Sequence, residues 1–249
     1  MRWPPLVRGE LIRRENRFRV AVRVDGLETA AHLANSGRLR ELLQPGVPVW
    51  LTSVEGAARK THYDLALVEH EGALVSVDAR LPNRLFAEAL AAHWLDCGAG
   101  PVQVQAEARL GASRLDFRLS TVEARCWVEV KSVTLVRDGL ALFPDAPTLR
   151  GARHLRELAA ALQGCQERAA VVFLVQRDDA QCFAPNSDAD PAFARALAEA
   201  AHAGVAVRAY GCRVSLREIV VAGELPVQLS QGHCPDICSE EREDGEAID

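Results

Sequence analysis

The sequence has no hydrophobic stretch long enough to cross a membrane. Its longest wholly apolar run, residues 169–175, spans seven positions, whereas a membrane-spanning helix needs about 20. The N-terminal segment also lacks an apolar run of the length that a signal peptide requires. We therefore expect a cytoplasmic protein without a membrane partner.

The cysteines lack the regular spacing of a disulfide framework, and their number, seven, is odd. This usage is typical of a reducing compartment. His233, Cys234 and Cys238 offer only three zinc ligands at irregular spacing, which does not favour a structural zinc site. We interpret four further cysteines, which fall within or beside expected elements, as small buried hydrophobic side chains: Cys126, Cys165, Cys182 and Cys212.

The sequence contains no Gly-rich phosphate loop, serine nucleophile elbow or dinucleotide fingerprint, so it lacks the motifs of those enzyme classes. Lysine is scarce as well. The chain has 27 arginines but only two lysines, Lys60 and Lys131. A lysine at position 131 therefore stands out, although two lysines must fall somewhere.

Positive charge is unevenly distributed, although the net charge is −5. Residues 239–249 hold six acids and one arginine, which accounts for the whole imbalance, and residues 1–60 hold ten arginines and one lysine against six acids. The N-terminal segment is thus a candidate phosphate-binding surface. An ordinary solvated charged face is the alternative. The candidate nucleic-acid contacts in this segment are Arg13, Arg14, Arg17 and Arg38.

Residues 1–80 have the pattern of a small β-barrel, with short strands separated by turn signals such as Asp25-Gly26. We expect an OB-like barrel, because that fold commonly binds nucleic acid. The predicted strands are residues 17–24, 47–54, 63–68 and 73–77.

From about residue 81 the pattern changes to alternating helices and strands, which predicts a mixed sheet with helices on both faces over residues 81–228. Thr148 and Asp190 are candidate helix caps, Pro191 suits a first helical position, and Gly204 suits a helix end. The C-terminal segment, residues 229–249, is rich in acidic residues and is expected to be disordered. The predicted helices are 84–94, 149–162 and 191–203, and the predicted strands are 102–108, 114–119, 126–136, 169–175 and, as the last, 205–214.

Asp116 and Glu129 are a candidate pair of metal ligands. A hairpin centred between Val122 and Glu123 places them directly opposite each other, and Lys131 shares the face of Glu129 because side chains alternate along a strand. Opposed carboxylates repel unless a cation lies between them. A hard divalent ion, Mg²⁺ or Mn²⁺, suits oxygen ligands. The turn lacks the glycine or asparagine that would fix this register, and a Glu-x-Lys triplet also occurs by chance.

Four further residues are candidates for the same site or its substrate. Glu88, on the first helix, is a possible acidic ligand, with a surface glutamate as the alternative. Gln176 follows the buried strand at its polar end. Arg150 and His154 lie one turn apart on a helix and are candidate phosphate contacts, with a solvated helix face as the alternative.

Several segments together closely resemble the sugar fermentation stimulation protein A family, over about residues 8–215. The most specific are Glu-Val-Lys-Ser-Val-Thr at 129–134 and Phe-Pro-Asp-Ala-Pro-Thr at 143–148. The others are residues 37–46, Pro82-Asn83, Arg150-Gly151 and His154-Leu155.

The resemblance implies an OB-like domain, a PD-(D/E)xK nuclease-like domain, and DNA binding with a role in regulating sugar-utilisation genes. It also implies that Asp116, Glu129 and Lys131 match the nuclease motif, with Glu88 and Gln176 as looser matches. Two hypotheses remain open at this point. The protein is a DNA-binding protein with a nuclease-like scaffold, an active metal-dependent nuclease acting on DNA or RNA, or both. A homodimer is possible.

Overall fold

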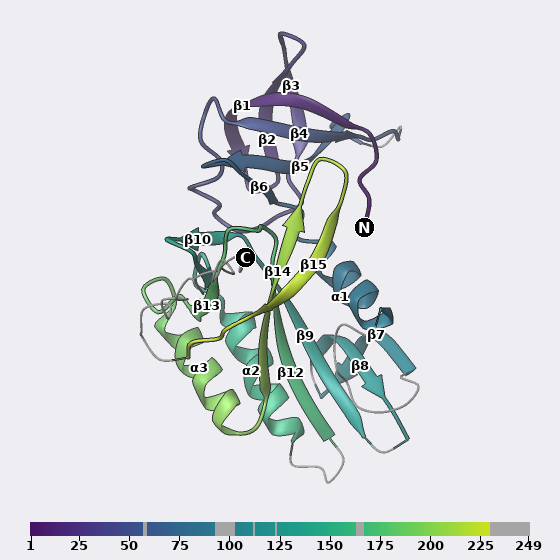
Figure 1. Ribbon diagram of the computed structural model, residues 1–249, viewed down its shortest axis with the longest axis vertical. Helices are drawn as coiled ribbons and strands as arrows, with labels where there is room; N and C mark the ends of the chain where they lie inside the picture. Colours follow the sequence, from purple (N-terminus) through teal and green to yellow (C-terminus); the bar gives the residue numbers. More distant parts are fainter. Residues whose placement is uncertain (57–58, 93–102, 112, 123, 163–166, 230–249) are drawn as a thin grey trace, which may run out of the picture.

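The chain folds into a β-barrel followed by an α/β domain (Figure 1). This computed structural model describes residues 1–56, 59–92, 103–111, 113–122, 124–162 and 167–229. Residues 230–249 of the acidic tail, which include Cys234 and Cys238, lie outside the described residues. No helix among the described residues is long and apolar enough to cross a membrane.

Five strands close the barrel, since β1 to β5 run in the order β3-β2-β1-β4-β5 and β3 also pairs with β5. The predicted OB-like barrel is confirmed. Asp25 and Gly26, with φ of +49° and +81°, form the predicted turn. The strands are β1 Leu6–Asn16, β2 Arg19–Val24, β3 Leu27–His32, β4 Pro48–Ser53, β5 Tyr63–His70 and the appended β6 Ala73–Ser76.

The α/β domain is built on a six-stranded mixed sheet in the order β15-β14-β12-β9-β8-β7. Strands β9, β12 and β14 are parallel, and the outer strands are antiparallel to their neighbours. The sheet strands are β7 Gln103–Leu110, β8 Ser113–Ser120, β9 Arg125–Val133, β12 Glu167–Val175, β14 Ala206–Val214 and β15 Ile219–Leu225.

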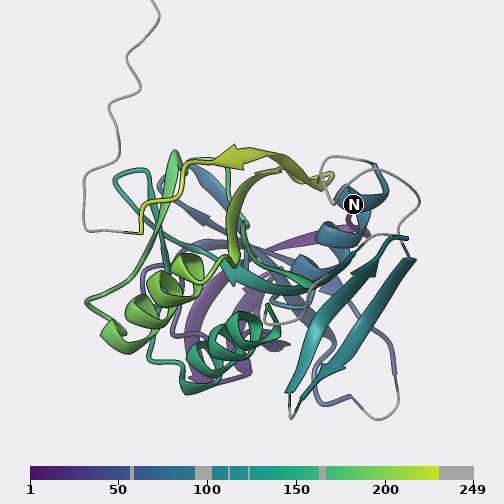
Figure 2. The same ribbon diagram turned by 90° about the horizontal axis from the view of Figure 1, so that it is seen from below.

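Helices cover both faces of this sheet, as predicted. Helices α2 Leu149–Ala161 and α3 Pro191–His202 lie side by side on one face, and α1 Leu81–Ala91 lies on the other (Figures 1 and 2). A small second sheet, which the sequence did not indicate, contains β10 Leu135–Arg137, β11 Leu140–Phe143 and β13 Cys182–Pro185.

The predicted helix caps are confirmed. The hydroxyl of Thr148 accepts the N–H of Gly151 at 3.0 Å, and the carboxylate of Asp190 accepts the N–H of Phe193 at 3.0 Å. The first helix, however, begins at Leu81 rather than residue 84, with Pro82 in its first turn. Strand 205–214 is not the last, because β15 follows it as an edge strand.

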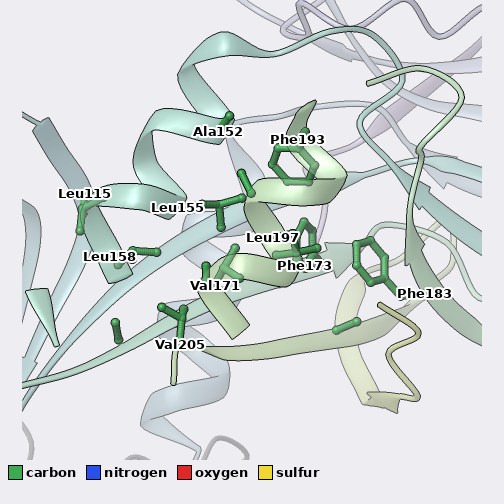
Figure 3. Close-up of a cluster of buried hydrophobic side chains, with 14 of the residues drawn as sticks. Leu115, Ala152, Leu155, Leu158, Val171, Phe173, Phe183, Phe193, Leu197 and Val205 are labelled. Atoms are coloured by element: carbon green, nitrogen blue, oxygen red, sulfur yellow. The ribbon is translucent and has the colours of Figure 1, made fainter. Parts of the chain in front are cut away.

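Two apolar cores lie on opposite faces of the sheet, and β12 contributes to both. Val171 and Phe173 face α2 and α3 (Figure 3), whereas Val172 and Leu174 face α1. This explains the uninterrupted apolar run of this strand, since a central parallel strand is buried on both faces. Phe173 and Phe183 stack with ring centroids 4.1 Å apart.

One cysteine differs from the expectation. Cys182 is fully buried, as expected, but it is also disulfide-bonded, which the sequence did not indicate. Cys212 is a free, fully buried cysteine, and burial raises the pKa of its thiol to about 12. Cys126 is a partly buried thiol, and Cys165 lies outside the described residues.

Hydrogen bonds join the barrel directly to the α/β domain. The carboxylate of Asp145 accepts the backbone N–H groups of Arg38 at 2.6 Å and Leu39 at 3.2 Å. The amide of Gln176 donates to the carbonyl of Ser76 at 3.0 Å, and the N–H of Ser76 donates back to the carbonyl of Gln176 at 3.0 Å. Only four residues separate β6 from α1, so the two domains meet without a free linker.

Gly37 is required at this junction because a Cβ atom there would lie 2.7 Å from Oδ2 of Asp145. We expect Gly37→Ala to displace Asp145 from its two N–H donors and to lower the free energy of unfolding by about 1–3 kcal/mol. Urea denaturation measures this change. Gly223→Ala is the matched control, since a Cβ atom at Gly223 would meet nothing within 4 Å. Equal stabilities of the two variants would contradict the prediction.

Candidate metal centre

Asp116 and Glu129 lie on neighbouring antiparallel strands, β8 and β9. The hairpin pairs Phe117 with Val128 and Ser120 with Arg125, which is the predicted register. The turn needs no glycine, because Thr121 closes it. The N–H of Thr121 donates to the carbonyl of Ala124 at 2.9 Å, and its hydroxyl accepts the N–H of Ala124 at 3.1 Å.

Asp116 lies just beyond the last paired residues of this hairpin, and its side chain takes the place of a strand partner. Its Oδ2 accepts the backbone N–H of Val130 at 2.8 Å. Its Oδ1 accepts the side-chain amide of Asn83, on α1, at 2.8 Å. Asn83 was not predicted as a site residue. Pro82, a signal for the first turn of a helix, would have placed it on α1.

Glu129 is buried, with 4 % of its surface exposed, and its two oxygens differ. Oε1 accepts a hydrogen bond from the ammonium of Lys131 and lies 2.6 Å from Nδ1 of His154. Oε2 is buried and has no hydrogen-bond partner among the described residues. A buried oxygen of an acid that lacks a partner is costly unless a further group binds it.

The two carboxyl groups are shifted in opposite directions. Burial, and then the charge of Glu129, raise the pKa of Asp116 above its usual range, against the hydrogen bonds from Val130 and Asn83. Burial alone would raise the pKa of Glu129 too, but the hydrogen bond with His154 and the charge of Lys131 outweigh it, so the pKa of Glu129 is lowered. A cation beside Asp116 would lower the pKa of this carboxyl group again.

The donor set fits a hard divalent cation. Two carboxylates converge from opposed strands, and one of them has a free, buried oxygen. The described residues contain no group of three or more His, Cys, Asp and Glu side chains arranged to hold a metal. A cation held by Asp116 and Glu129 would therefore need further ligands, such as water, to complete its coordination shell.

The structure does not bring Glu88 to this centre, so that assignment is corrected. On α1, Asn83 points toward β8, whereas the carboxylate of Glu88 forms an ion pair with the amino group of Met1 at 3.0 Å. Glu88 also lines a separate hollow with Arg213 and Val220. Glu88 is exposed on α1, so the structure supports the alternative of a surface glutamate.

Gln176 lies near the centre but does not contact its carboxylates among the described residues. It is fully buried, and its amide nitrogen donates to the hydroxyl of Ser132 at 3.1 Å as well as to Ser76. Ser132 follows Lys131 on β9. Gln176 therefore connects the strand that carries Lys131 to the barrel.

The predicted arginines of the barrel separate into two groups. Arg13 is paired with Glu28 at 2.8 Å, and the guanidinium of Arg14 is occupied by four backbone carbonyls, including those of Gly37 and Arg38. Arg14 is thus a structural clamp rather than a phosphate contact. Arg17 and Arg38 are exposed and form no ion pair with a described residue.

Arg150 and His154 differ as well. Arg150 is exposed, and its Nε lies 3.3 Å from Nε2 of His154. His154 is only 1 % exposed, so it is not part of a solvated helix face, and its role as a phosphate contact stays a prediction. It belongs to the carboxylate cluster. The sequence hides this because the partner of His154 is 25 residues away on β9.

The fold and the site define a class of protein in which an OB barrel precedes a mixed-sheet α/β domain with an Asp-Glu-Lys cluster. The family models match accordingly. The model described as SfsA N-terminal OB domain matches residues 12–77, and the model described as sugar fermentation stimulation protein RE domain matches residues 80–218. The chain belongs to the sugar fermentation stimulation protein family.

Relatives cover nearly the whole chain. It is 48% identical over 226 residues to a sugar fermentation stimulation protein homolog of Moorella thermoacetica, covering 90% of this chain and 97% of that protein. A homolog from Natranaerobius thermophilus is 48% identical over 227 residues, covering 89% and 94%. The solved structure of Pyrococcus furiosus SfsA in complex with Ca²⁺ superposes with a TM-score of 0.84 at 35% identity, covering 92% and 98%.

The raised pKa of Asp116 leads to a prediction about stability. Its folded pKa lies above the ordinary value of 3.8, so the stability it contributes is full below pH 3.8 and is lost as the pH rises through the folded pKa. Asp116→Asn should therefore raise the free energy of unfolding at neutral pH by about 0.5–2 kcal/mol, with no gain below pH 3.8. Mn²⁺ should raise the melting temperature of the wild type but not of the variant.

Thermal unfolding at several pH values, with and without Mn²⁺, tests this. Glu199→Gln, at an exposed position on α3, makes the same change of charge and should alter neither property. A variant at position 116 that is less stable at neutral pH, or that is stabilised by Mn²⁺ as much as the wild type, would refute the assignment.

Proposed function

We propose that the protein binds DNA and hydrolyses its phosphodiester bonds with a divalent cation held by Asp116 and Glu129. The observation that carries this proposal is the buried, unpartnered Oε2 of Glu129 beside a second carboxylate. Lys131 and His154 both contact Oε1, so Oε2 is open to a further ligand. Lys131, 15 % exposed at its side chain, supplies a compact positive charge at the same place.

Each residue has a distinct task in this proposal. Asp116 and Glu129 would hold the cation, which lowers the pKa of a bound water and shields phosphate oxygens. Asn83 and the N–H of Val130 fix the orientation of Asp116. Lys131, anchored on Oε1 of Glu129, stabilises the negative charge that develops on the phosphate.

The Ca²⁺ in the Pyrococcus furiosus relative supports a divalent ion here as well. Ca²⁺ and Mg²⁺ both prefer oxygen ligands, but Mg²⁺ is held by fewer protein carboxylates and more waters. Two carboxylates therefore favour Mg²⁺ or Mn²⁺ as the working ion. The ammonium of Lys131 occupies a position where a planar guanidinium would not substitute.

The nucleic acid would lie along a groove between the domains, which we call the junction groove. Its volume is about 330 Å³, and a hollow of about 250 Å³ adjoins it at Leu135 and Asp145. Arg17 lines the groove, and Arg38, Arg40 and Arg137 line the hollow. Ser132, directly after Lys131, is part of the groove wall, so the groove borders the strand that carries the site.

Phe18 supports a single strand as the bound form. This aromatic side chain is 46 % exposed, and the guanidinium of Arg17 lies 5.3 Å from the centre of its ring. An exposed ring beside cationic groups is a typical platform for stacking unpaired bases.

Binding without hydrolysis is the second candidate function. The burial of Glu129 and His154, 4 % and 1 % exposed, favours it, because a scissile phosphate has to reach Glu129. In this case the protein would recognise DNA and act as a regulator. The two candidate functions differ in whether cleaved nucleic acid is formed.

For hydrolysis, Glu129→Gln and Lys131→Ala should each lower the cleavage rate at least about 100-fold, because each removes a charge that acts in the transition state. Labelled single-stranded DNA, duplex DNA and RNA are incubated with Mg²⁺ or Mn²⁺. Glu88→Gln is the control and should cleave like the wild type, since Glu88 lies elsewhere. Equal product from wild type and both variants would leave binding alone as the function.

For binding, Arg17→Gln combined with Arg38→Gln should weaken affinity for single-stranded DNA and reduce the salt slope by about one per residue. Arg13→Gln combined with Arg23→Gln removes the same charge from ion-paired arginines and should leave the slope unchanged. Fluorescence anisotropy at several salt concentrations measures both. Equal losses in the two double variants would exclude the junction groove as the contact surface.

A further inference from the structure

We propose that His154 is a positioning residue, which turns the free oxygen of Glu129 toward the metal. The inference rests on the proposed metal site but not on hydrolysis. It starts from the asymmetry of the Glu129 carboxylate, in which Oε1 is engaged twice and Oε2 not at all among the described residues.

The contact with Arg150 determines which nitrogen of His154 carries the proton. A guanidinium only donates hydrogen bonds, so Nε2 of His154, 3.3 Å from Nε of Arg150, has to accept. The proton of the neutral ring is then on Nδ1. Nδ1 lies 2.6 Å from Oε1 of Glu129 and donates to it. Arg150 donates to His154, and His154 donates to Oε1 of Glu129, so the two donors form a chain that ends at a single oxygen.

This chain fixes how the carboxylate is rotated. Lys131 and His154 both donate to Oε1, so a rotation of the carboxylate would break two hydrogen bonds. Lys131 has a long, flexible side chain, but His154 is held on α2 between buried neighbours, among them Leu155 and Leu158. His154 is thus the rigid donor of the two.

The position of α2 fixes where the ring of His154 lies. Gly151, one turn earlier, allows the helix to approach α3, since a Cβ atom there would lie 3.1 Å from the ring of Phe193. Thr148 fixes the start of the helix. Second-layer residues that orient a metal ligand typically change metal affinity 10- to 100-fold when removed.

The test measures binding of Mn²⁺ alone to the full chain, by titration calorimetry without nucleic acid. His154→Leu should weaken Mn²⁺ binding about 10- to 100-fold. His154→Asn should restore most of the affinity, because its amide keeps a donor near the position of Nδ1. His202→Leu, at an exposed histidine in the last turn of α3, is the control for loss of a histidine and should bind like the wild type.

A second measurement does not involve the metal. The ¹⁵N resonances of the His154 ring should show the proton on Nδ1, and Arg150→Leu should remove this preference. Mn²⁺ binding by His154→Leu that equals the wild type, or a proton on Nε2, would overturn the proposal. If Mn²⁺ binding depends on His154 but no nucleic acid is cleaved, hydrolysis fails and the positioning role stands. If the wild type binds no Mn²⁺, both are overturned.

Discussion

The burial of the Glu129 carboxylate is the constraint on which the rest of the α/β domain depends. A buried ion loses several kcal/mol of hydration, so its partners have to be held in place. Lys131 comes from the same strand, but His154 comes from α2. The position of α2 on the sheet is therefore tied to a polar contact as well as to the apolar core beneath it.

Most of the contacts that stabilise α2 and α3 lie outside the carboxylate cluster. The Phe173 core and the caps at Thr148 and Asp190 hold α2 and α3 to the sheet without using any charge of the site. The site itself keeps groups that a stability-driven sequence would avoid, namely repelling carboxylates and a bare buried oxygen. Such local conflicts are expected where function, rather than folding, selects the residues.

Features set by local rules were predictable from the sequence. The opposition of Asp116 and Glu129 followed from counting along a hairpin, and the helix caps followed from residue type. Features set by distant partners were not. No local feature of the sequence indicated the ion pair between Glu88 and the amino group of Met1. His154 and Arg14 likewise showed nothing locally of their partners on β9 and in the loop at residues 37–38. The short strands β10, β11 and β13 carry too few residues for a periodic signal.

The bonds between the barrel and the sheet have a consequence for how this architecture can change. Asp145 completes a barrel loop, Gln176 completes the edge of β6, and Gly37 leaves room for Asp145. Each domain thus supplies groups that the other lacks. The two domains are therefore not interchangeable. A chimera that joined this barrel to an unrelated α/β domain would leave the backbone N–H groups of Arg38, Leu39 and Ser76 without their partners. Recombination can therefore transfer the barrel and the α/β domain only together.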